Sequence, residues 1–492
     1  MYKEPNGQDQ EADVVVVGTG PGGLAAVGSA VAAGAEVVSI EAHDRLGGNG
    51  LLSTGWVAFV DCALQREQGI EDSVELFLED CEKLVKESGE VWGLAWDKDL
   101  TRLFAQESSK MYDILTERGV KFPRLIKRPL QTSVDRLAAV EDTNMFAAAF
   151  EPDFAGPHVS AYLKCSVDRL IVVDGAVKGV RVQPRDGSSP FTIRARKGVV
   201  LAAGGFQANP KLRRHFQSDI GPMGVYPGLD TCRGDMHLLG QAIGGDLVNM
   251  TMIPPLVAVP SHLTEEAIAV NAKGKRFHDE AGPYGARVAA LKKQDQRRGH
   301  YIYDANTFSR KRQYVDMVPP PRVKANTLRE LAAKIKVPGE ALEQSVREWN
   351  EFLATGETKD PATGRVQFEP SRRPISEAPF YSNPMVVGVS LSVGGFVTTA
   401  SMQVVDVFGN PIPGLFAVGD CAGGLTPTAE MGGTHLGGGF VLGWVAGQAI
   451  VTGKLAAPHK KGTFGQHVSK SNQSDIRMPV INAGQAVPTA RL

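Results

Sequence analysis

The chain has 492 residues, and its 53 Lys and Arg residues nearly balance its 54 Asp and Glu residues, giving a formal net charge of −1. This balance excludes the basic excess of a nucleic-acid-binding protein, and the length predicts two or three domains with a large buried interior. The five cysteines are scattered without metal-ligand spacing, so we expect no disulfide, haem, iron–sulfur centre or metal site. The polar N-terminal stretch has no targeting pattern, which makes the cytoplasm the expected location.

Residues 14–41 predict a β-α-β unit. The run VVVV is typical of a buried parallel strand, GTGPGG of a tight turn, LAAVGSAVAAG of a helix and EVVSIEA of a second strand. The turn contains the pattern G-x-G-x-x-G at Gly18, Gly20 and Gly23, and Glu41 ends the second strand. This strand–turn–helix context makes the glycine pattern a specific signal for a dinucleotide.

Each residue type in this unit suits dinucleotide binding. The first glycine permits the turn, the second lets the backbone approach a pyrophosphate, and the third lets the helix pack on the strand. The helix N-terminus favours the anion, and Glu41 accepts hydrogen bonds from ribose hydroxyls, which argues against a 2′-phosphate. The cofactor residues predicted here are Gly18, Gly20, Pro21, Gly22, Gly23, Glu41 and Ala42.

Further along the chain, the pattern predicts one domain interrupted by another. Helices are expected over 73–87 and 100–119, and strands return over 166–184 and 198–206. A mixed α/β pattern with amphipathic stretches over 326–354 then replaces the glycine-rich pattern, which resumes later. The predicted boundaries are 12–245 and 386–455 for the first domain, 246–385 for the inserted domain and 456–492 for a polar tail.

The most apolar long segment begins at Leu436. It is short of a full membrane span and contains several glycines and Gln448. This composition predicts a buried helix, so we expect no membrane span.

A second motif lies near the far end of the chain. Residues 412–424, IPGLFAVGDCAGG, resemble the second dinucleotide signature of the two-motif flavoproteins, in which an acidic residue, here Asp420, reaches the flavin side of the cofactor. Four further stretches resemble the flavoprotein superfamily that contains the fumarate reductases and the 3-ketosteroid dehydrogenases. These stretches are residues 45–56, 199–212, 232–245 and 269–280. Together the matches cover most of residues 12–454.

The resemblance implies an α/β fold, in which a Rossmann-type FAD-binding domain carries an inserted mixed α/β substrate domain that caps the flavin. No histidine occurs in residues 45–60, where covalently flavinylated members have one, so FAD is expected to bind noncovalently. The glycines after His435 resemble the start of the last helix, whose dipole would stabilise negative charge on reduced flavin. The cofactor residues implied by the resemblance are Gly48, Asn49, Gly55, Val167, Ala203, Gly204, Asp235, Gly419, Asp420, Gly437, Gly438, Gly439 and Phe440.

The chain departs from the family pattern at residues 155–173. Members usually have a helix and a strand before the V-x-x-L strand, whereas here the segment runs straight on and is shorter. We therefore expect an altered adenine end of the site.

The resemblance leaves two chemical branches, because members move a hydride between flavin N5 and a carbon beside an activating group. Fumarate reductases clamp two carboxylates with histidines and arginines. Where those enzymes have H-x-x-G-G, this chain reads Ser392-Val393-Gly394-Gly395 without a histidine. It also has no histidine in residues 251–257, and His435 in place of a terminal arginine. Arg365, in ATGR, is the candidate for the proton-donating arginine. A site with so few cations would hold a dianion poorly.

The stretch RFHDEAGPYGARV points to the other branch. It strongly resembles the 3-ketosteroid 1-dehydrogenases, which have their catalytic tyrosine at the position of Tyr284. A phenol there can take the proton from the carbon α to a carbonyl while flavin takes a hydride from the β carbon. His435 replaces a second tyrosine that polarises the carbonyl, with the N–H of Gly437 or Gly439 as a further donor. Because of this replacement, a smaller cyclic ketone is as good a candidate as a steroid.

We therefore predict an FAD-dependent dehydrogenase that forms a carbon–carbon double bond beside a ketone, with Tyr284, His435 and Arg365 as candidate catalytic residues. Its expected partners are a small-molecule substrate, a cyclic ketone or steroid, and an external electron acceptor. The alternatives are an enoate reductase with Arg365 as donor, and an FAD-binding protein without turnover. Core packing is the competing interpretation for Tyr284, His435, Tyr112 and Trp56, and a structural ion pair for Arg365.

Overall fold

The structure is a computed structural model of the 492-residue chain. It describes residues 2–3, 7–84, 86, 95–127, 132–217, 225–251, 255–257, 259, 261–282, 284–316, 318, 320–389, 391–426 and 431–455. Only the backbone is described for residues 255–257, 261, 262, 284, 285, 296 and 313. The predicted tail, 456–492, lies outside the described residues.

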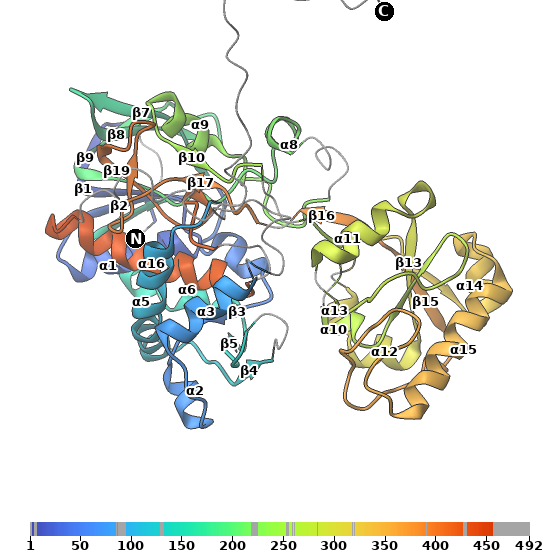
Figure 1. Ribbon diagram of the computed structural model, residues 1–492. Coiled ribbons are helices and arrows are strands. Elements are labelled where there is room, and N and C mark those ends of the chain that lie inside the picture. Colours follow the sequence, from blue (N-terminus) through green and yellow to red (C-terminus); the bar gives the residue numbers. More distant parts are fainter. Residues whose placement is uncertain are drawn as a thin grey trace, which may run out of the picture.

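An eight-stranded sheet forms the centre of the larger lobe (Figure 1). Five strands run parallel in the order β19-β9-β1-β2-β6, while β18 and the β7–β8 pair add antiparallel strands. The bounds are β1 Gln10–Val17, β2 Val37–Ile40, β6 Val159–Tyr162, β7 Cys165–Val173, β8 Ala176–Pro184, β9 Phe191–Leu201, β18 Gln403–Val405 and β19 Pro411–Ala417. This arrangement confirms the predicted α/β fold.

The alternation of side chains along β1 explains why both faces of this sheet are covered. Val14 and Val16 are fully buried against α1 (Pro21–Ala32) and its neighbours, whereas Val15 and Val17 are buried against the β7–β8 pair and α9 (Asp235–Ala242). A strand that is apolar on both faces must be buried on both faces. The run VVVV therefore places the following turn at the end of a strand in the middle of the fold.

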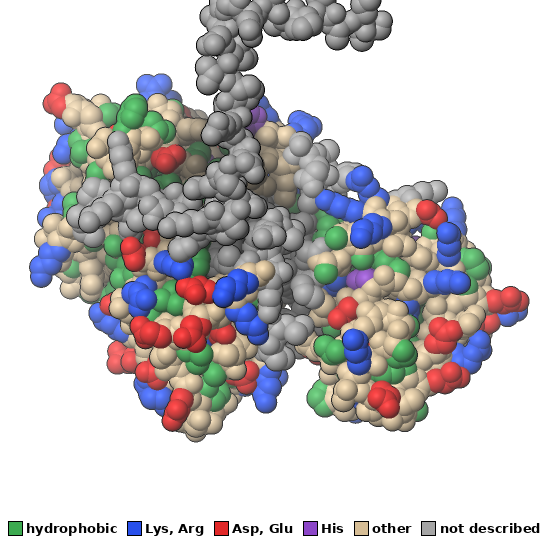
Figure 2. Space-filling model, in the orientation of Figure 1, with side chains coloured by type: hydrophobic (Ala, Val, Ile, Leu, Met, Phe, Trp, Pro, Cys, Tyr) green, Lys and Arg blue, Asp and Glu red, His purple; other side chains and the backbone are tan. Residues whose placement is uncertain are grey.

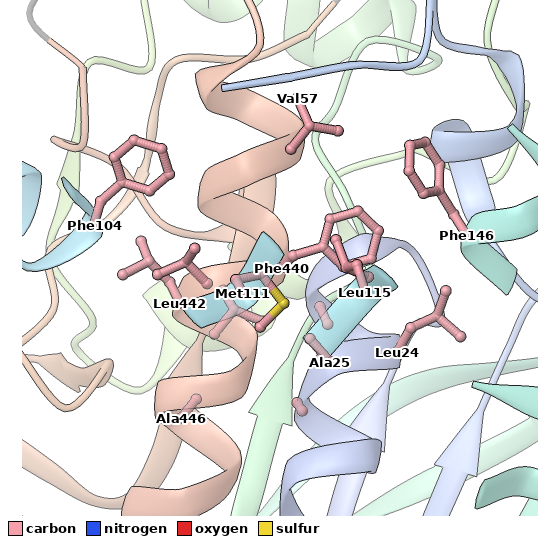
Figure 3. Close-up of a cluster of buried hydrophobic side chains, with 14 of the residues drawn as sticks. Leu24, Ala25, Val57, Phe104, Met111, Leu115, Phe146, Phe440, Leu442 and Ala446 are labelled. Carbon is pink, nitrogen blue, oxygen red and sulfur yellow. The ribbon is translucent and has the colours of Figure 1, made fainter. Parts of the chain in front are cut away.

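Helix α16 (Thr434–Thr452) packs directly against α1 because glycines line the contact. A Cβ at Gly443 would lie 2.2 Å from the Gly22 carbonyl oxygen, and one at Gly447 would lie 2.4 Å from the Ala26 carbonyl oxygen. Figure 3 shows the apolar side chains of both helices, including Phe440, in one cluster with side chains of other elements. The two backbones thus approach more closely than any side chain would allow.

The remaining elements of the larger lobe pack around this centre. Helix α5 (Lys98–Glu117) supports α16, and a small antiparallel sheet lies beside it (Figure 1). The predicted helices at 73–87 and 100–119 correspond to α3 and α5. The bounds are η1 Gly48–Leu52, β3 Trp56–Ala58, α2 Ala63–Glu67, α3 Val74–Leu84, β4 Arg124–Ile126, β5 Leu137–Ala139, α6 Asn144–Ala148, α7 Glu151–Ala155, α8 Pro210–Phe216 and η4 Gly419–Cys421.

The segment 155–173, expected to be shorter than in the family, contains a short strand, β6, before β7. β6 pairs in parallel with β2 from Val37↔Val159 to Ile40↔Tyr162 and takes the outer position of the parallel sheet. It is only four residues long, and Lys164, with φ 53°, turns the chain straight into β7. Two five-residue helices, α6 and α7, precede it. The brevity of these elements hid them in the sequence.

The smaller lobe has its own sheet, in the order β12-β13-β15-β14, with helices on both faces (Figure 1). Ile268 and Val270 face α14 and α15, whereas Ala269 and Tyr301 face a second cluster that includes residues of α11. The bounds are α10 Ser261–Thr264, β12 Ile268–Asn271, α11 Tyr284–Lys292, η3 Asp295–Arg297, β13 Gly299–Tyr303, α12 Ala305–Arg310, α13 Arg312–Val315, β14 Val323–Ala325, α14 Leu328–Ile335, α15 Gly339–Thr355 and β15 Phe380–Pro384.

Two short antiparallel pairs are formed by the segments that precede and follow the smaller lobe in the chain. β10 (Leu247–Val248) pairs with β17 (Gly395–Phe396), and β11 (Pro255–Val257) pairs with β16 (Val387–Val389). Lys, Arg, Asp and Glu are interspersed over the face of both lobes shown in Figure 2. Among the described residues, no helix is long and apolar enough to cross a membrane.

The substitution Gly443→Ala tests the contact between α1 and α16. Since the new methyl group would lie 2.2 Å from the Gly22 carbonyl oxygen, we expect the free energy of unfolding to fall by about 1–3 kcal/mol. Gln448→Ala changes an exposed position of the same helix and should leave the urea midpoint unchanged. If Gly443→Ala also left the midpoint unchanged, the helices could not be packed this closely.

Candidate functional site

The turn between β1 and α1 has the geometry that a pyrophosphate requires. Gly18 has φ +98°, and a Cβ there would lie 2.4 Å from the Ala202 carbonyl oxygen, while a Cβ at Gly23 would lie 2.0 Å from the Gly18 carbonyl oxygen. Gly20, the N-cap of α1, has no atom within 4 Å of its Cβ position. The turn is therefore closed on the protein side and open where a phosphate would meet the helix N-terminus.

Glu41 is held in place at the end of β2 by a residue that the sequence patterns did not single out. The backbone N–H and the hydroxyl of Thr19 donate to its Oε2 at 2.8 and 2.6 Å, and the His43 N–H donates to Oε1 at 2.8 Å. Each carboxylate oxygen can accept more than one hydrogen bond, so Glu41 retains capacity for ribose hydroxyls. The residues present thus fit the adenosine half of FAD.

Several other predicted cofactor residues lie next to this turn. A Cβ at Gly48, in η1, would lie 3.0 Å from the Gly20 Cα, so η1 packs directly on the turn. Ala203 and Gly204 follow β9, and Gly204 has φ +74°. Gly55 also has positive φ. The Ala42 carbonyl accepts a hydrogen bond from Arg185.

Three predicted cofactor residues have side chains in other surroundings. Val167 is buried in β7, where it pairs with Val182. Asp235 is the exposed first residue of α9. The ring of Phe440 packs against those of Phe146 and Phe150 in the core. Any contact of Val167 or Phe440 with the cofactor would therefore involve the backbone.

A small, partly open pocket lies at the predicted flavin end, where α16 begins. Predicted cofactor residues from two separate stretches, Gly419–Asp420 and Gly438–Gly439, line it together with His435 and Ser392. The other lining residues are Leu100, Val393, Ala422, Gly423, Leu425, Thr426 and Leu442. None of these described lining residues is Arg or Lys, so the pocket lacks the cations that a dicarboxylate site needs.

Asp420 is half-buried at the wall of this pocket. Burial raises the pKa of Asp420 to about 6, although hydrogen bonds from Gln207 and from the Ser392 N–H oppose the shift. The Gln207 amide lies 3.4 Å from Oδ2, and His237 Nε2 donates to the Asp420 carbonyl oxygen at 3.1 Å. Hydroxyl groups of a bound ribityl chain would provide the solvation that this carboxylate lacks. Asp420 thus fits the flavin half of FAD.

His435, the second residue of α16, meets the pocket as a neutral imidazole. Burial lowers the pKa of His435 to about 4, and its buried Nε2 has no hydrogen-bond partner. A neutral imidazole protonated at Nε2 can donate one hydrogen bond there. The geometry does not support the same role for Gly437, because the Gly437 N–H already donates to the Gly433 carbonyl oxygen at 3.0 Å. That part of the prediction was wrong, since a helix pairs its N–H groups from the second turn onward.

Arg365 and Tyr284 are not among the described residues that line this pocket. Arg365 is fully buried in the smaller lobe, where its guanidinium lies 3.2 Å from Glu280 Oε2 and stacks over Trp349. Arg276 also pairs with Glu280. The backbone of Tyr284 begins α11, which lies on the side of the smaller lobe that faces the larger one (Figure 1). The Tyr284 side chain lies outside the described residues.

Long-range contacts supply the residues that the sequence did not reveal. Thr19 orients Glu41, and Gln207 and His237 hold Asp420 from segments far away in the chain. The only local signal was that Thr19 lies inside the glycine turn. Tyr112, a candidate assisting tyrosine, is buried in the core, edge-on to Phe59.

A family model described as "FAD binding domain" matches residues 13–436. The urocanate reductase of Eggerthella lenta is 27% identical, over 90% of this chain and 75% of its own length. The 4-oxocyclohexanecarboxylate 2-dehydrogenase of Sinomonas cyclohexanicum is 27% identical, over 95% of this chain and 97% of its own length. The open conformation of a flavocytochrome c3 fumarate reductase has a TM-score of 0.77 at 25% identity, over 90% of this chain and 78% of that one.

The substitution Asp420→Asn tests the carboxylate at the pocket wall. Because the pKa of Asp420 is raised from 3.8 to about 6, ionising this group destabilises the fold progressively from pH 4 to pH 6 and fully above pH 6. In FAD-free protein, the variant should therefore gain roughly 3 kcal/mol of unfolding free energy over the wild type at pH 7.5 and little at pH 4.

Urea unfolding at both pH values measures this difference. Asp406→Asn is the control, since backbone N–H groups, led by that of Asn410, lower the pKa of the exposed Asp406 and its loss should give no gain at pH 7.5. An equal gain for Asp420→Asn at both pH values would contradict the assigned cause.

Proposed function

The chain belongs to the FAD binding domain family, and from this premise we propose that it desaturates a cyclic ketone, forming a carbon–carbon double bond next to the carbonyl group. It is an FAD-dependent oxidoreductase of the fumarate reductase and ketosteroid dehydrogenase type. The proposal concerns the substrate class and the roles of individual residues.

The observation that carries the proposal is the neutral, unpartnered Nε2 of His435 in a pocket without described cations. A buried hydrogen-bond donor without a partner is costly, and a ketone oxygen would satisfy it. That donor would also stabilise the negative charge that develops on the oxygen as the α proton leaves. Ser392 supports the same choice, because it offers no charge to a carboxylate.

One relative supports a small ring ketone as the substrate class. The name of the 4-oxocyclohexanecarboxylate dehydrogenase states that it acts on a cyclohexane ring with a ketone, and the match extends over nearly the whole length of both proteins. We include cyclohexanones with and without a carboxylate, and 3-ketosteroids, in the substrate class. The electrons would leave through oxygen, a quinone or another protein.

In the proposed reaction, Tyr284 takes the proton from the α carbon and His435 holds the carbonyl oxygen. Bound FAD would supply the acceptor for the hydride of the β carbon, and the product would be an enone. To accept a proton, Tyr284 must be a phenolate.

Anaerobic titration of the FAD-loaded protein tests the substrate class. We expect cyclohexanones or 3-ketosteroids to bleach the flavin absorbance. If ketones left the flavin oxidised and fumarate or another enoate reoxidised the reduced flavin, the enzyme would be an enoate reductase, as other relatives are by name. In that alternative Arg365, whose Nη1 pairs with Glu280, is the candidate proton donor. Protein that stayed colourless with added FAD would exclude both reactions.

The substitution Tyr284→Phe tests the base. It keeps the ring and removes the hydroxyl, so the rate of flavin reduction by the best ketone should fall by roughly 10²- to 10⁴-fold while FAD still binds. Tyr112→Phe is the matched control, because Tyr112 packs in the core of the other lobe and should keep its rate. A near-normal rate in Tyr284→Phe, measured by stopped-flow absorbance, would remove Tyr284 from the mechanism.

A further inference from the structure

A cluster of polar groups encloses the side chain of Asn49, in the η1 segment beside the glycine turn. The Asn49 amide donates to the Tyr226 hydroxyl and to Cys232 Sγ, the latter at 3.2 Å, and its Oδ1 accepts from the Leu229 N–H at 2.9 Å. Every polar atom of this side chain therefore has a partner from residues 226–232. We call Asn49, Tyr226, Leu229 and Cys232 the Asn49 cluster.

The Asn49 cluster is closely packed. A Cβ at Gly228 would lie 2.3 Å from the Tyr226 hydroxyl oxygen and 2.8 Å from Asn49 Oδ1. Burial raises the pKa of Tyr226 above its usual range, and burial raises the pKa of Cys232 to about 11. Both groups are thus neutral hydrogen-bonding partners at physiological pH.

On one side, the Asn49 cluster is connected to the cofactor turn. Asn49 lies between Gly48, whose Cβ position is 3.0 Å from the Gly20 Cα, and Gly50, whose Cβ position is 2.9 Å from the Pro21 ring. A displacement of Asn49 would therefore move the segment that packs on the dinucleotide turn. The same close packing makes η1 sensitive to whatever binds at that turn.

On the other side, the Asn49 cluster is connected to the chain that joins the lobes. The N–H of Val225, next to Tyr226, donates to the Val387 carbonyl oxygen at 2.9 Å, and the Val389 N–H donates to the Val225 carbonyl oxygen at 2.9 Å. Val387 and Val389 belong to β16, which pairs with β11. The chain enters the smaller lobe after β11 and returns from it through β16. Val225 thus extends the connecting strands toward the larger lobe.

We propose that Tyr226 is a positioning residue that couples FAD binding to the strands connecting the two lobes. Its hydroxyl fixes Asn49 and η1 against the dinucleotide turn, while the adjacent backbone pairs with β16. FAD bound at the turn holds η1 and, through Tyr226, stabilises the pairing of Val225 with β16. This role goes beyond the proposed ketone chemistry and does not depend on the identity of the substrate.

Hydrogen exchange with and without FAD tests the proposal in the full-length protein. In the wild type, FAD should slow exchange in peptides that contain Val225 and residues 387–389. Tyr226→Phe removes only the hydroxyl, so this FAD-dependent protection should disappear, and the dissociation constant of FAD, measured by flavin fluorescence, should rise roughly three- to tenfold.

A matched control separates coupling from a general loss of stability. Tyr303→Phe also removes a buried tyrosine hydroxyl that donates to an asparagine, Asn383 Oδ1 at 2.6 Å, but in the smaller lobe. It should keep the FAD-dependent protection at residues 387–389. Gly228→Ala, which retains the Tyr226 hydroxyl but displaces it, should lose the protection and serves if Tyr226→Phe folds poorly. The proposal is overturned if Tyr226→Phe or Gly228→Ala shows the FAD-dependent protection of the wild type. It is also overturned if Tyr303→Phe loses this protection.

Discussion

The close contact of α1 with α16 is the interaction on which the site depends. Because glycines at positions 22, 443 and 447 leave room for backbone against backbone, the start of α1 lies directly against the middle of α16. Each helix N-terminus carries partial positive charge. The N-terminus of α1 meets the open space at Gly20, and α16 begins at the pocket that contains His435. A single packing contact thus places two anion-stabilising helix ends along one extended cofactor.

Burial sets the charges in the pocket. It raises the pKa of Asp420 to about 6 and lowers the pKa of His435 to about 4, so at pH 7.5 the pocket contains a carboxylate and a neutral imidazole. A pocket with a carboxylate, one free donor and no described cation suits a ketone better than a dianion. Arg365, the candidate proton donor for the reductase alternative, instead lies with Arg276 in a buried network around Glu280. That network stabilises the smaller lobe, whose side facing the larger lobe carries the start of α11.

The sequence was sufficient for the parts of the site that local pattern determines. The strand, the glycine turn and Glu41 follow one another within a single β-α-β unit, so spacing alone identified them. Resemblance identified Asp420, which lies in a second short motif. Neither approach could identify Thr19 or Tyr226 as structural partners, because their hydrogen bonds to Glu41 and Asn49 depend on how distant segments fold together.

Two failures have the same physical origin. The strand β6 was missed because four residues carry too little periodicity to identify it without its partner strand. The role suggested for the Gly437 N–H was wrong because the first intrahelical hydrogen bond depends on where the helix begins, at Thr434.

The central claim concerns the orientation of a ketone at His435. A structure of the FAD-loaded protein with a saturated cyclic ketone tests it most directly: the account predicts the carbonyl oxygen at about 3 Å from His435 Nε2, with the α carbon facing Tyr284. A ketone bound with its oxygen away from His435 would contradict it.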